Sequence, residues 1–142
     1  MRIIPFQPQY RDDMIFMVLE AKNALGRIPH LNEDLLDIDC SYYQKGDMFW
    51  IALDEEDRVI GCIGYHIIAP NTAKLQRLYV KYSLKRRGIG TKLLNTAEYD
   101  LRLKGIQKIA VHLGDSDYWE SRLFYPAHGY QESKSAYMTK EL

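Results

Sequence analysis

The sequence predicts an α/β fold in which a mixed, mostly antiparallel sheet of about six or seven strands is flanked by about four helices. Two apolar runs, at 48–53 and 59–68, flank a charged turn, as the strands of a hairpin do. An amphipathic stretch at 89–103 stands between two strand-like segments, which is typical of a parallel βαβ crossover. The length of 142 residues suits one domain that covers residues 1–142.

The N-terminal part combines a short strand with helices. Residues 2–6 are partly apolar and are followed by a proline, so they favour a first strand at an edge of the sheet. Between residues 10 and 25 apolar side chains recur at helical spacing, and Gly26 fits the end of that helix. Asn32 suits an N-cap with acids in the first turn, so we expect a second helix at 33–45.

The remaining segments complete the sheet and its cover. We expect a strand at 75–82 after the hairpin and another at 107–113 after the amphipathic helix, because their apolar residues are continuous or alternate. Residues 117–128 have the pattern of a further helix. Two edge strands that pair with each other are expected at 129–132 and 136–141.

Composition and charge limit the kinds of binding partner and the cellular location that the sequence favours. The formal net charge is zero, so the overall charge favours neither nucleic acid nor an anionic membrane surface. The two cysteines, Cys40 and Cys62, lack metal-like spacing and indicate reduced thiols in a cytoplasmic protein without a metal. The first residues lack the apolar run of a signal peptide, and no segment reaches the roughly 20 apolar residues of a membrane span. We therefore expect a cytoplasmic protein without nucleic-acid or membrane partners.

Basic residues gather in one part of the chain. Between residues 72 and 108 there are ten bases and two acids, and a run of three bases at 85–87 directly precedes Gly88 and Gly90. A helix start has unpaired N–H groups and a partial positive charge, which make it a binding site for anions. Glycines there let a phosphate approach the backbone closely. The pattern favours a phosphate-bearing cofactor, although paired glycines also occur at helix starts for structural reasons alone.

Two motifs resemble those of a known family. The stretch LQRLYVKYSLKRRGIGTKLL, residues 75–94, resembles the acyl-CoA-binding motif of the GNAT N-acetyltransferase superfamily, which has an apolar strand, a Gln/Arg-x-x-Gly-x-Gly/Ala turn and a helix. FYPAHGY, residues 124–130, resembles the C-terminal signature of that family. The order of the expected elements also matches the GNAT fold. The resemblance implies an enzyme that passes an acetyl group from acetyl-CoA to a primary amine of a small molecule or peptide by direct attack.

The resemblance also implies which residues hold the acetyl-CoA. Backbone groups of Leu78 and Val80 would bond its thioester and pantetheine arm, and the N–H groups of residues 86–91 would surround its pyrophosphate. Lys85 stands where the family usually has Gln or Arg, and it keeps the charge but loses the planar fork. The expected cofactor-binding residues are Leu78, Tyr79, Val80, Lys85, Arg86, Arg87, Gly88, Ile89, Gly90 and Thr91.

For the chemistry, the resemblance assigns Tyr125 as the general acid that protonates the departing thiolate. The N–H of Val80 would stabilise the tetrahedral oxyanion. The family often has an asparagine seven residues before the tyrosine, and this chain has Tyr118 there. The family's cofactor contact from that position is therefore not expected.

The general base is left open by the sequence. Family members often have a glutamate on the central strand, where this chain has Gln76, which cannot accept a proton. His66 on the preceding strand and His112 on the following one are candidates, because imidazole titrates near neutral pH. Asp115, Glu120 and a water relay to a carboxylate are further candidates.

The acceptor is expected to lie against the N-terminal helices, the loop between them and the C-terminal hairpin. The acids and aromatics Asp34, Asp37, Tyr42 and Tyr43 suit a cationic amine, and a solvated helix face with core aromatics explains them as well. Two other classes of function stay open. The lack of a carboxylate at the central strand is compatible with a non-catalytic acyl-CoA-binding or sensor domain. A nucleic-acid-binding protein is disfavoured by the zero net charge. Homodimer formation is left open.

Overall fold

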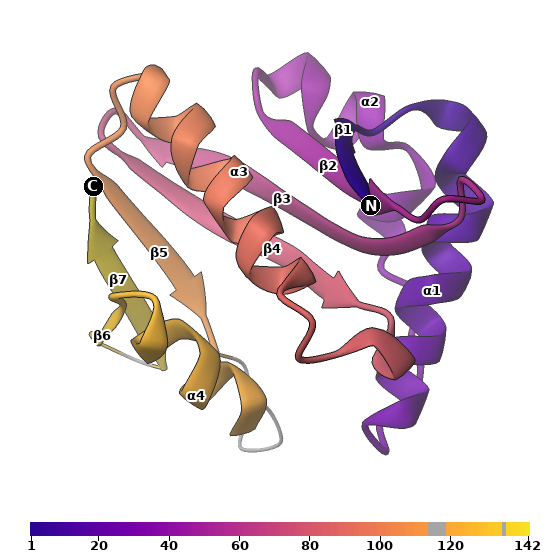
Figure 1. Cartoon of the computed structure of the whole chain (residues 1–142). Coiled ribbons are helices and arrows are strands. Elements are labelled where there is room, and N and C mark those ends of the chain that lie inside the picture. The colour runs from indigo at the N-terminus through magenta and orange to yellow at the C-terminus, as the bar shows by residue number, and fades with distance from the viewer. Residues whose placement is uncertain (114–118, 135) are drawn as a thin grey trace.

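The computed structural model describes residues 1–113, 119–134 and 136–142 (Figure 1). Within these residues it contains one seven-stranded sheet with the strand order β1-β2-β3-β4-β5-β7-β6. The strands are β1 (Arg2–Pro5), β2 (Met48–Leu53), β3 (Val59–Ala69), β4 (Thr72–Val80), β5 (Lys108–His112), β6 (Gln131–Glu132) and β7 (Tyr137–Glu141). The helices are α1 (Arg11–Ala24), α2 (Ile38–Ser41), α3 (Ile89–Leu103), α4 (Trp119–Ala127) and the short 3-10 helices η1 (Pro8–Tyr10), η2 (Glu33–Leu36), η3 (Tyr43–Lys45) and η4 (Tyr82–Leu84). Of these described helices, none is both long enough and apolar enough to cross a membrane.

The topology of the sheet confirms the predicted fold class. Neighbouring strands are antiparallel except β4 and β5, which run parallel and are connected through α3. The predicted hairpin is formed by β2 and β3. The C-terminal strands differ from the prediction, because β7 lies between β5 and β6 and only β6 is an edge strand. The alternating sequence of β7 predicts a strand, but the alternation does not show how many neighbours the strand has.

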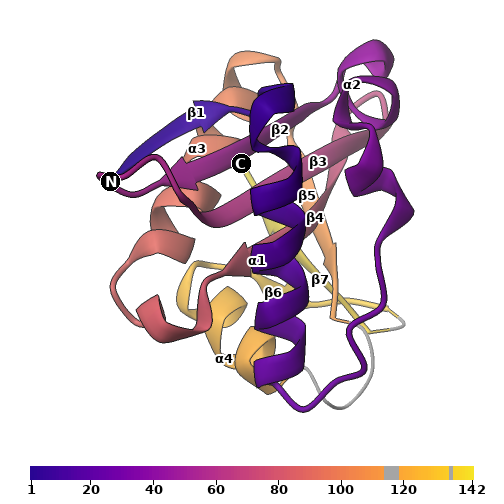
Figure 2. The same ribbon diagram turned by 90° about the vertical axis from the view of Figure 1, so that its right-hand side faces the viewer.

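Helices cover both faces of the sheet (Figures 1 and 2). α3 and α4 lie on one face, whereas α1 and α2 lie on the other. Each pair of helices covers its own apolar cluster. Leu93, Leu94 and Leu101 of α3 belong to the first cluster, and Met14 and Val18 of α1 belong to the second.

The strand β2 separates these two clusters. Phe49 and Ile51 are buried beneath α1, whereas Trp50 and Ala52 are buried beneath α3. Successive side chains of a strand point to opposite faces, so a strand that is covered on both faces needs apolar residues at every position. The unbroken apolar run of β2 is therefore the sequence signal of a strand that is covered on both faces.

The segment predicted as one helix at 33–45 is instead three short pieces, η2, α2 and η3. The break falls at Asp37, whose φ of −147° and ψ of 85° are not helical. The Asp37 carboxylate accepts a hydrogen bond from the Cys40 N–H, with an N···O distance of 3.0 Å. An aspartate is more favourable at an N-cap than inside a helix. Asp37 therefore starts a new helix and interrupts the predicted one.

Gly64 of β3 lies tightly against the aromatic residues beneath α1. A Cβ atom at this position would lie 2.6 Å from Cδ2 of Phe49 and 2.9 Å from Cε1 of Tyr42. We predict that Gly64→Ala lowers the free energy of unfolding by about 1–3 kcal/mol, because over-packing forces core side chains out of their rotamers. Denaturant unfolding measures the change. The cost should be smaller in a Phe49→Leu background, and an equal cost in both backgrounds would contradict the steric explanation.

Candidate active site

The sheet opens between β4 and β5. The two strands pair in parallel only from Thr72 to Leu75 of β4, and β4 then continues to Val80 without β5 beside it. Figure 1 shows the two strands diverging below the N-terminal end of α3. A cleft of about 640 Å³ lies at this opening. Its lining residues come from β4, the end of β5, the loop before α3, the first turn of α3, α4, and the end of α1 with the segment that follows it.

A β-bulge bends β4 at the opening. Gln76 lies opposite Gly64 and Tyr79 lies opposite Cys62, so β4 has one more residue than β3 between these pairs. Inside the bulge, Arg77 has a positive φ of 59°. The Arg77 carbonyl accepts a hydrogen bond from the Cys62 thiol at 3.1 Å. Burial raises the pKa of this thiol to about 12, so it keeps its proton and can donate. The bulge gives the strand its local bend and increases its twist.

The loop before α3 has a backbone geometry that suits an anion. Arg86 and Gly88 have positive φ values of 65° and 82°. Left-handed residues in such a loop turn successive N–H groups toward one concave site. Gly88 is the N-cap of α3 and gives no side-chain capping bond, and the first turn of α3 contains no acid. The partial positive charge of this helix start is therefore not neutralised by its own first turn.

Most of the residues predicted to hold the cofactor meet in this cleft. Nine of the ten line it, and the exception is Arg87. Lys85 forms an ion pair with Glu120 of α4, so one of the predicted cofactor-binding residues is paired with one of the candidate bases. Gly90 brings the loop close to α4, because a Cβ there would lie 3.4 Å from the Phe124 ring. Binding of the cofactor itself stays a prediction.

Tyr125 of α4 lines the same cleft and is only 6% exposed. Burial raises the pKa of its phenol, and the nearby Tyr79 raises it further. The Tyr125 hydroxyl is therefore protonated at neutral pH, which is the state that a general acid needs.

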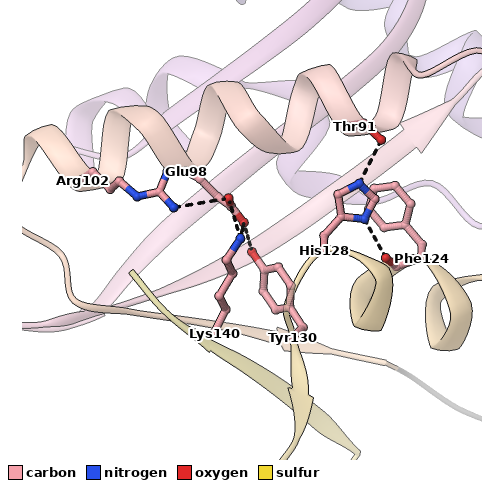
Figure 3. A network of polar contacts seen from close by, with 7 residues as sticks. All are labelled: Thr91, Glu98, Arg102, Phe124, His128, Tyr130 and Lys140. Carbon is pink, nitrogen blue, oxygen red and sulfur yellow. Dashed lines mark hydrogen bonds and ion pairs between the residues drawn. The ribbon is translucent and has the colours of Figure 1, made fainter.

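The FYPAHGY segment is attached to the start of α3 through His128 (Figure 3). The imidazole Nδ1 donates to the Phe124 carbonyl at 2.7 Å, and Nε2 lies 3.0 Å from the Thr91 hydroxyl. Thr91 is one of the predicted cofactor residues, and Phe124 directly precedes Tyr125. His128 thus connects the cofactor loop with the helix that carries the candidate acid.

A buried carboxylate, Glu98 of α3, makes the second attachment (Figure 3). It is 3% exposed and accepts hydrogen bonds from the Tyr130 hydroxyl at 2.7 Å and from the Lys140 ammonium at 3.1 Å. Arg102 lies 3.9 Å away on the same helix. A buried charge is tolerated when it is paired and hydrogen-bonded in this way. Sequence reasoning missed Glu98, although an acid beside the apolar stripe of a helix is a detectable signal.

The two candidate histidines lie in different surroundings. His112 at the end of β5 lines the cleft, as does Gln76 of β4. His66 does not line the cleft. Its Nδ1 lies 2.7 Å from the Asp47 carboxylate, and its ring stacks on Tyr42 with 4.4 Å between centroids. These contacts hold the His66 ring on the α1 face of the sheet, outside the lining of the cleft.

The other predicted residues are also accounted for. Glu120 lines the cleft, whereas Asp115 and Tyr118 lie outside the described residues. Within the described part of the chain, no three His, Cys, Asp or Glu side chains are grouped so that they could hold a metal ion. The four acids and aromatics expected at the acceptor do not line the cleft, and all four bond within the fold. The Tyr42 hydroxyl donates to Asp34 at 2.6 Å, the Tyr43 hydroxyl donates to the Phe6 carbonyl at 2.8 Å, and Asp37 caps α2.

A comparison with protein-family models identifies the class of protein. Residues 45–132 match the acetyltransferase (GNAT) domain family. The match covers more than half of the chain, which therefore belongs to the GNAT acetyltransferase family, as the two motifs indicated.

Individual relatives agree with this assignment. The Xenopus tropicalis protein named "Probable N-acetyltransferase 14" is 28% identical over 101 residues, which make up 70% of this chain and 47% of that protein. The chain thus spans about half the length of this curated relative.

Solved structures share the fold over nearly the whole chain. A GNAT family acetyltransferase from Staphylococcus aureus Mu50 has a TM-score of 0.91 at 22% identity, over 99% of this chain and 98% of that one. PaiA N-acetyltransferase from Thermoplasma acidophilum, in complex with coenzyme A, has a TM-score of 0.78 at 23% identity and full coverage of both chains (100% each). A GNAT family acetyltransferase from Brucella melitensis, in complex with acetyl-CoA, has a TM-score of 0.70 at 18% identity, over 99% of this chain and 87% of that one.

The contacts of His66 lead to a test that separates structural from catalytic roles. We predict that His66→Leu lowers the free energy of unfolding by about 1–3 kcal/mol, because the buried Asp47 carboxylate loses a hydrogen-bonding partner. The pH–rate profile should stay that of the wild type, since His66 lies outside the cleft. Denaturant unfolding and kinetics are measured side by side, with His112→Leu as the comparison variant. A changed pH–rate profile at unchanged stability would assign the proton transfer to His66 instead.

Proposed function

We propose that this chain is an acetyl-CoA-dependent N-acetyltransferase that acetylates a primary amine of a small molecule or peptide by direct attack. We further propose that residues 1–142 form one such domain. The observation that carries the proposal is the cleft in which an uncapped, cationic helix start and a buried, protonated Tyr125 meet at the open edge of β4.

The acyl donor fits the open edge of β4. Beyond Leu75 no described strand lies beside this edge, so its N–H and C=O groups are available to an extended, amide-containing chain such as pantetheine. In this proposal Leu78 and Val80 provide these backbone groups. The pyrophosphate binds the N–H groups of residues 86–91, and Lys85 and Arg86 add positive charge. The Thermoplasma and Brucella structures, which are complexes with coenzyme A and acetyl-CoA, support this choice of donor.

The chemistry follows from the groups around this edge. The neutral amine attacks the thioester carbon, and the N–H of Val80 hydrogen-bonds the oxyanion that forms. When the carbon–sulfur bond breaks, the thiolate takes the proton of Tyr125. An ordinary phenol pKa of about 10 already lies above that of a thiol at about 8.5, and burial raises the pKa of Tyr125 further, so this transfer depends on close positioning. The amine loses a proton to His112 in this scheme, or through water to a carboxylate.

A second function stays open because of one observation. Gln76 stands where a carboxylate is common in the family, and Glu120, the acid among the described residues that line the cleft, is already paired with Lys85. A cleft of this kind suits a domain that binds acyl-CoA without turning it over. Binding without turnover is therefore the outcome that favours this alternative.

The catalytic part of the proposal is tested with Tyr125→Phe. Thiol release from acetyl-CoA is measured over a panel of amines, together with CoA binding by calorimetry. We expect Tyr125→Phe to lower kcat about 100-fold or more, because positioned acids contribute factors of this size, while CoA affinity changes little. Tyr99→Phe, on an exposed tyrosine of α3, is the matched control. Wild-type kcat in Tyr125→Phe removes this residue from the mechanism, and CoA binding with no turnover of any amine supports the sensor alternative.

The donor part is tested with a pair of glycines that have the same conformation. Gly88 and Gly46 both have a φ of 82°, and neither would place a Cβ within 4 Å of another atom. Alanine in this region costs roughly 1–2 kcal/mol, so both Gly→Ala variants should lose similar stability. We expect only Gly88→Ala to weaken CoA binding, by about tenfold, because it distorts the loop that binds the pyrophosphate. Equal CoA affinity of the two variants would show that the loop does not bind the pyrophosphate.

A further inference from the structure

The α1 face of the cleft is lined by basic side chains. Leu75 of β4 belongs to the cluster beneath α3, so strand alternation directs Lys74 to the opposite face. The Arg77 side chain lies on that face too, because its Nε bonds Asp34 of η2 at 3.1 Å. Lys74 and Arg77 both line the cleft, together with Arg27 from the segment after α1.

Asp34, which lies next to Arg77, bonds only one of the nitrogens of the Arg77 guanidinium. Asp34 accepts the Arg77 Nε–H at 3.1 and 3.3 Å and the Tyr42 hydroxyl at 2.6 Å, and it does not line the cleft. Burial alone would raise the pKa of Asp34, but the bonds from Arg77 and Tyr42 outweigh burial and lower it. Among the described residues Arg77 bonds through Nε, and its two terminal Nη groups stay available for another acceptor.

Lys74 is likewise not neutralised by a described carboxylate. Its ammonium lies 5.8 Å from the centroid of the Tyr137 ring and forms no ion pair with a described residue. Glu120, the acid in the described lining of the cleft, is paired with Lys85 on the cofactor side. The described lining therefore has a positive charge on the side away from the donor.

The pKa of the buried Lys22 ammonium of α1 shows how burial and nearby charges in this region act on a cation. It is 8% exposed, and its Nζ donates to the His30 carbonyl at 2.8 Å. Burial lowers the pKa of Lys22, and the charge of Arg77 lowers it further and outweighs the opposing effect of Asp34. Burial thus disfavours any charge here, and the charge of Arg77 further disfavours an additional cation but attracts an anion.

We propose that the acceptor carries a carboxylate beside its amine and that Arg77 and Lys74 bind this carboxylate. The inference rests on the proposed N-acetyltransferase function and names its acceptor class. A guanidinium holds a carboxylate with two parallel N–H···O bonds, and the Lys74 ammonium adds a second positive charge. A carboxylate bound there places the amine at the opening of β4, which His112 and Tyr125 also line.

The test compares acceptors that differ in the carboxylate but little in amine basicity. Three pairs with different spacers are L-alanine and L-alaninol, β-alanine and 3-aminopropanol, and 4-aminobutyrate and 4-aminobutanol. Initial rates with acetyl-CoA are measured for each member. Binding of each compound to the CoA-saturated protein is measured in parallel by calorimetry, so that the inference is judged even where a pair is not turned over.

Two variants connect a preference to the proposed residues. We expect the wild type to favour the carboxylate member of at least one pair by about tenfold or more in kcat/KM or in affinity. Lys74→Met should abolish most of this preference through KM, with CoA affinity unchanged. Arg77→Lys keeps a charge near Asp34 and should retain part of the preference, whereas Arg77→Met should lose it. Lys108→Met, on the neighbouring strand outside the cleft, is the control.

The outcomes separate this inference from the function on which it rests. Equal or better use of the alcohol in every pair, or no tighter binding of any carboxylate, overturns the acceptor class and leaves the acetyltransferase proposal intact. A carboxylate preference that persists in Lys74→Met and Arg77→Met overturns the assignment to these residues. If CoA does not bind and no amine is acetylated, the proposed function itself fails.

Discussion

The pairing of backbone groups along β4 is the constraint on which this site depends. Up to Leu75 the strand is paired on both sides, and beyond Leu75 it is paired, among the described strands, with β3 alone. Buried N–H and C=O groups have to find partners. Inside the bulge the Cys62 thiol donates a hydrogen bond to the Arg77 carbonyl. The edge of β4 that faces β5 stays open to the cleft. The separation of β4 from β5 links three features of the site. It is required for the open edge of β4, for the start of α3 beside that edge and for the position of Tyr125.

The C-terminal signature is held in place largely by residues that take no part in the proposed chemistry. Tyr130 bonds the buried Glu98, and His128 bridges Thr91 and the Phe124 carbonyl. Burying a carboxylate is costly unless donors surround it, and here the donors come from the segment after α4 and from β7. The cost of this burial therefore helps to specify one position for α4. That position in turn determines where the Tyr125 hydroxyl lies relative to β4.

Local sequence signals predict most of the fold and the cofactor side of the cleft. The apolar face of 89–103, the hairpin and the two motifs are periodic or contiguous, so one stretch of sequence carries each of them. The features that the sequence does not predict depend on contacts with residues that are distant in the chain. No local signal indicates that Arg77 adopts a left-handed conformation, since its stabilising contacts come from Cys62 and Asp34. The exclusion of His66 from the cleft likewise depends on Asp47 and Tyr42, which precede it by about twenty residues.

The positive charge on the α1 face bears on the first requirement of direct attack, a neutral amine. Lys22 experiences the combined effect of burial and Arg77, and both lower its pKa. In the proposed function, an acceptor amine bound near Arg77 would experience effects of the same sign, so a larger fraction of it would be uncharged near neutral pH than in water. The same charge repels a protonated amine during approach, and an acceptor with only an amine would bind weakly. A carboxylate on the acceptor resolves this conflict, because it supplies the attraction while the surrounding bases favour the reactive form of the amine.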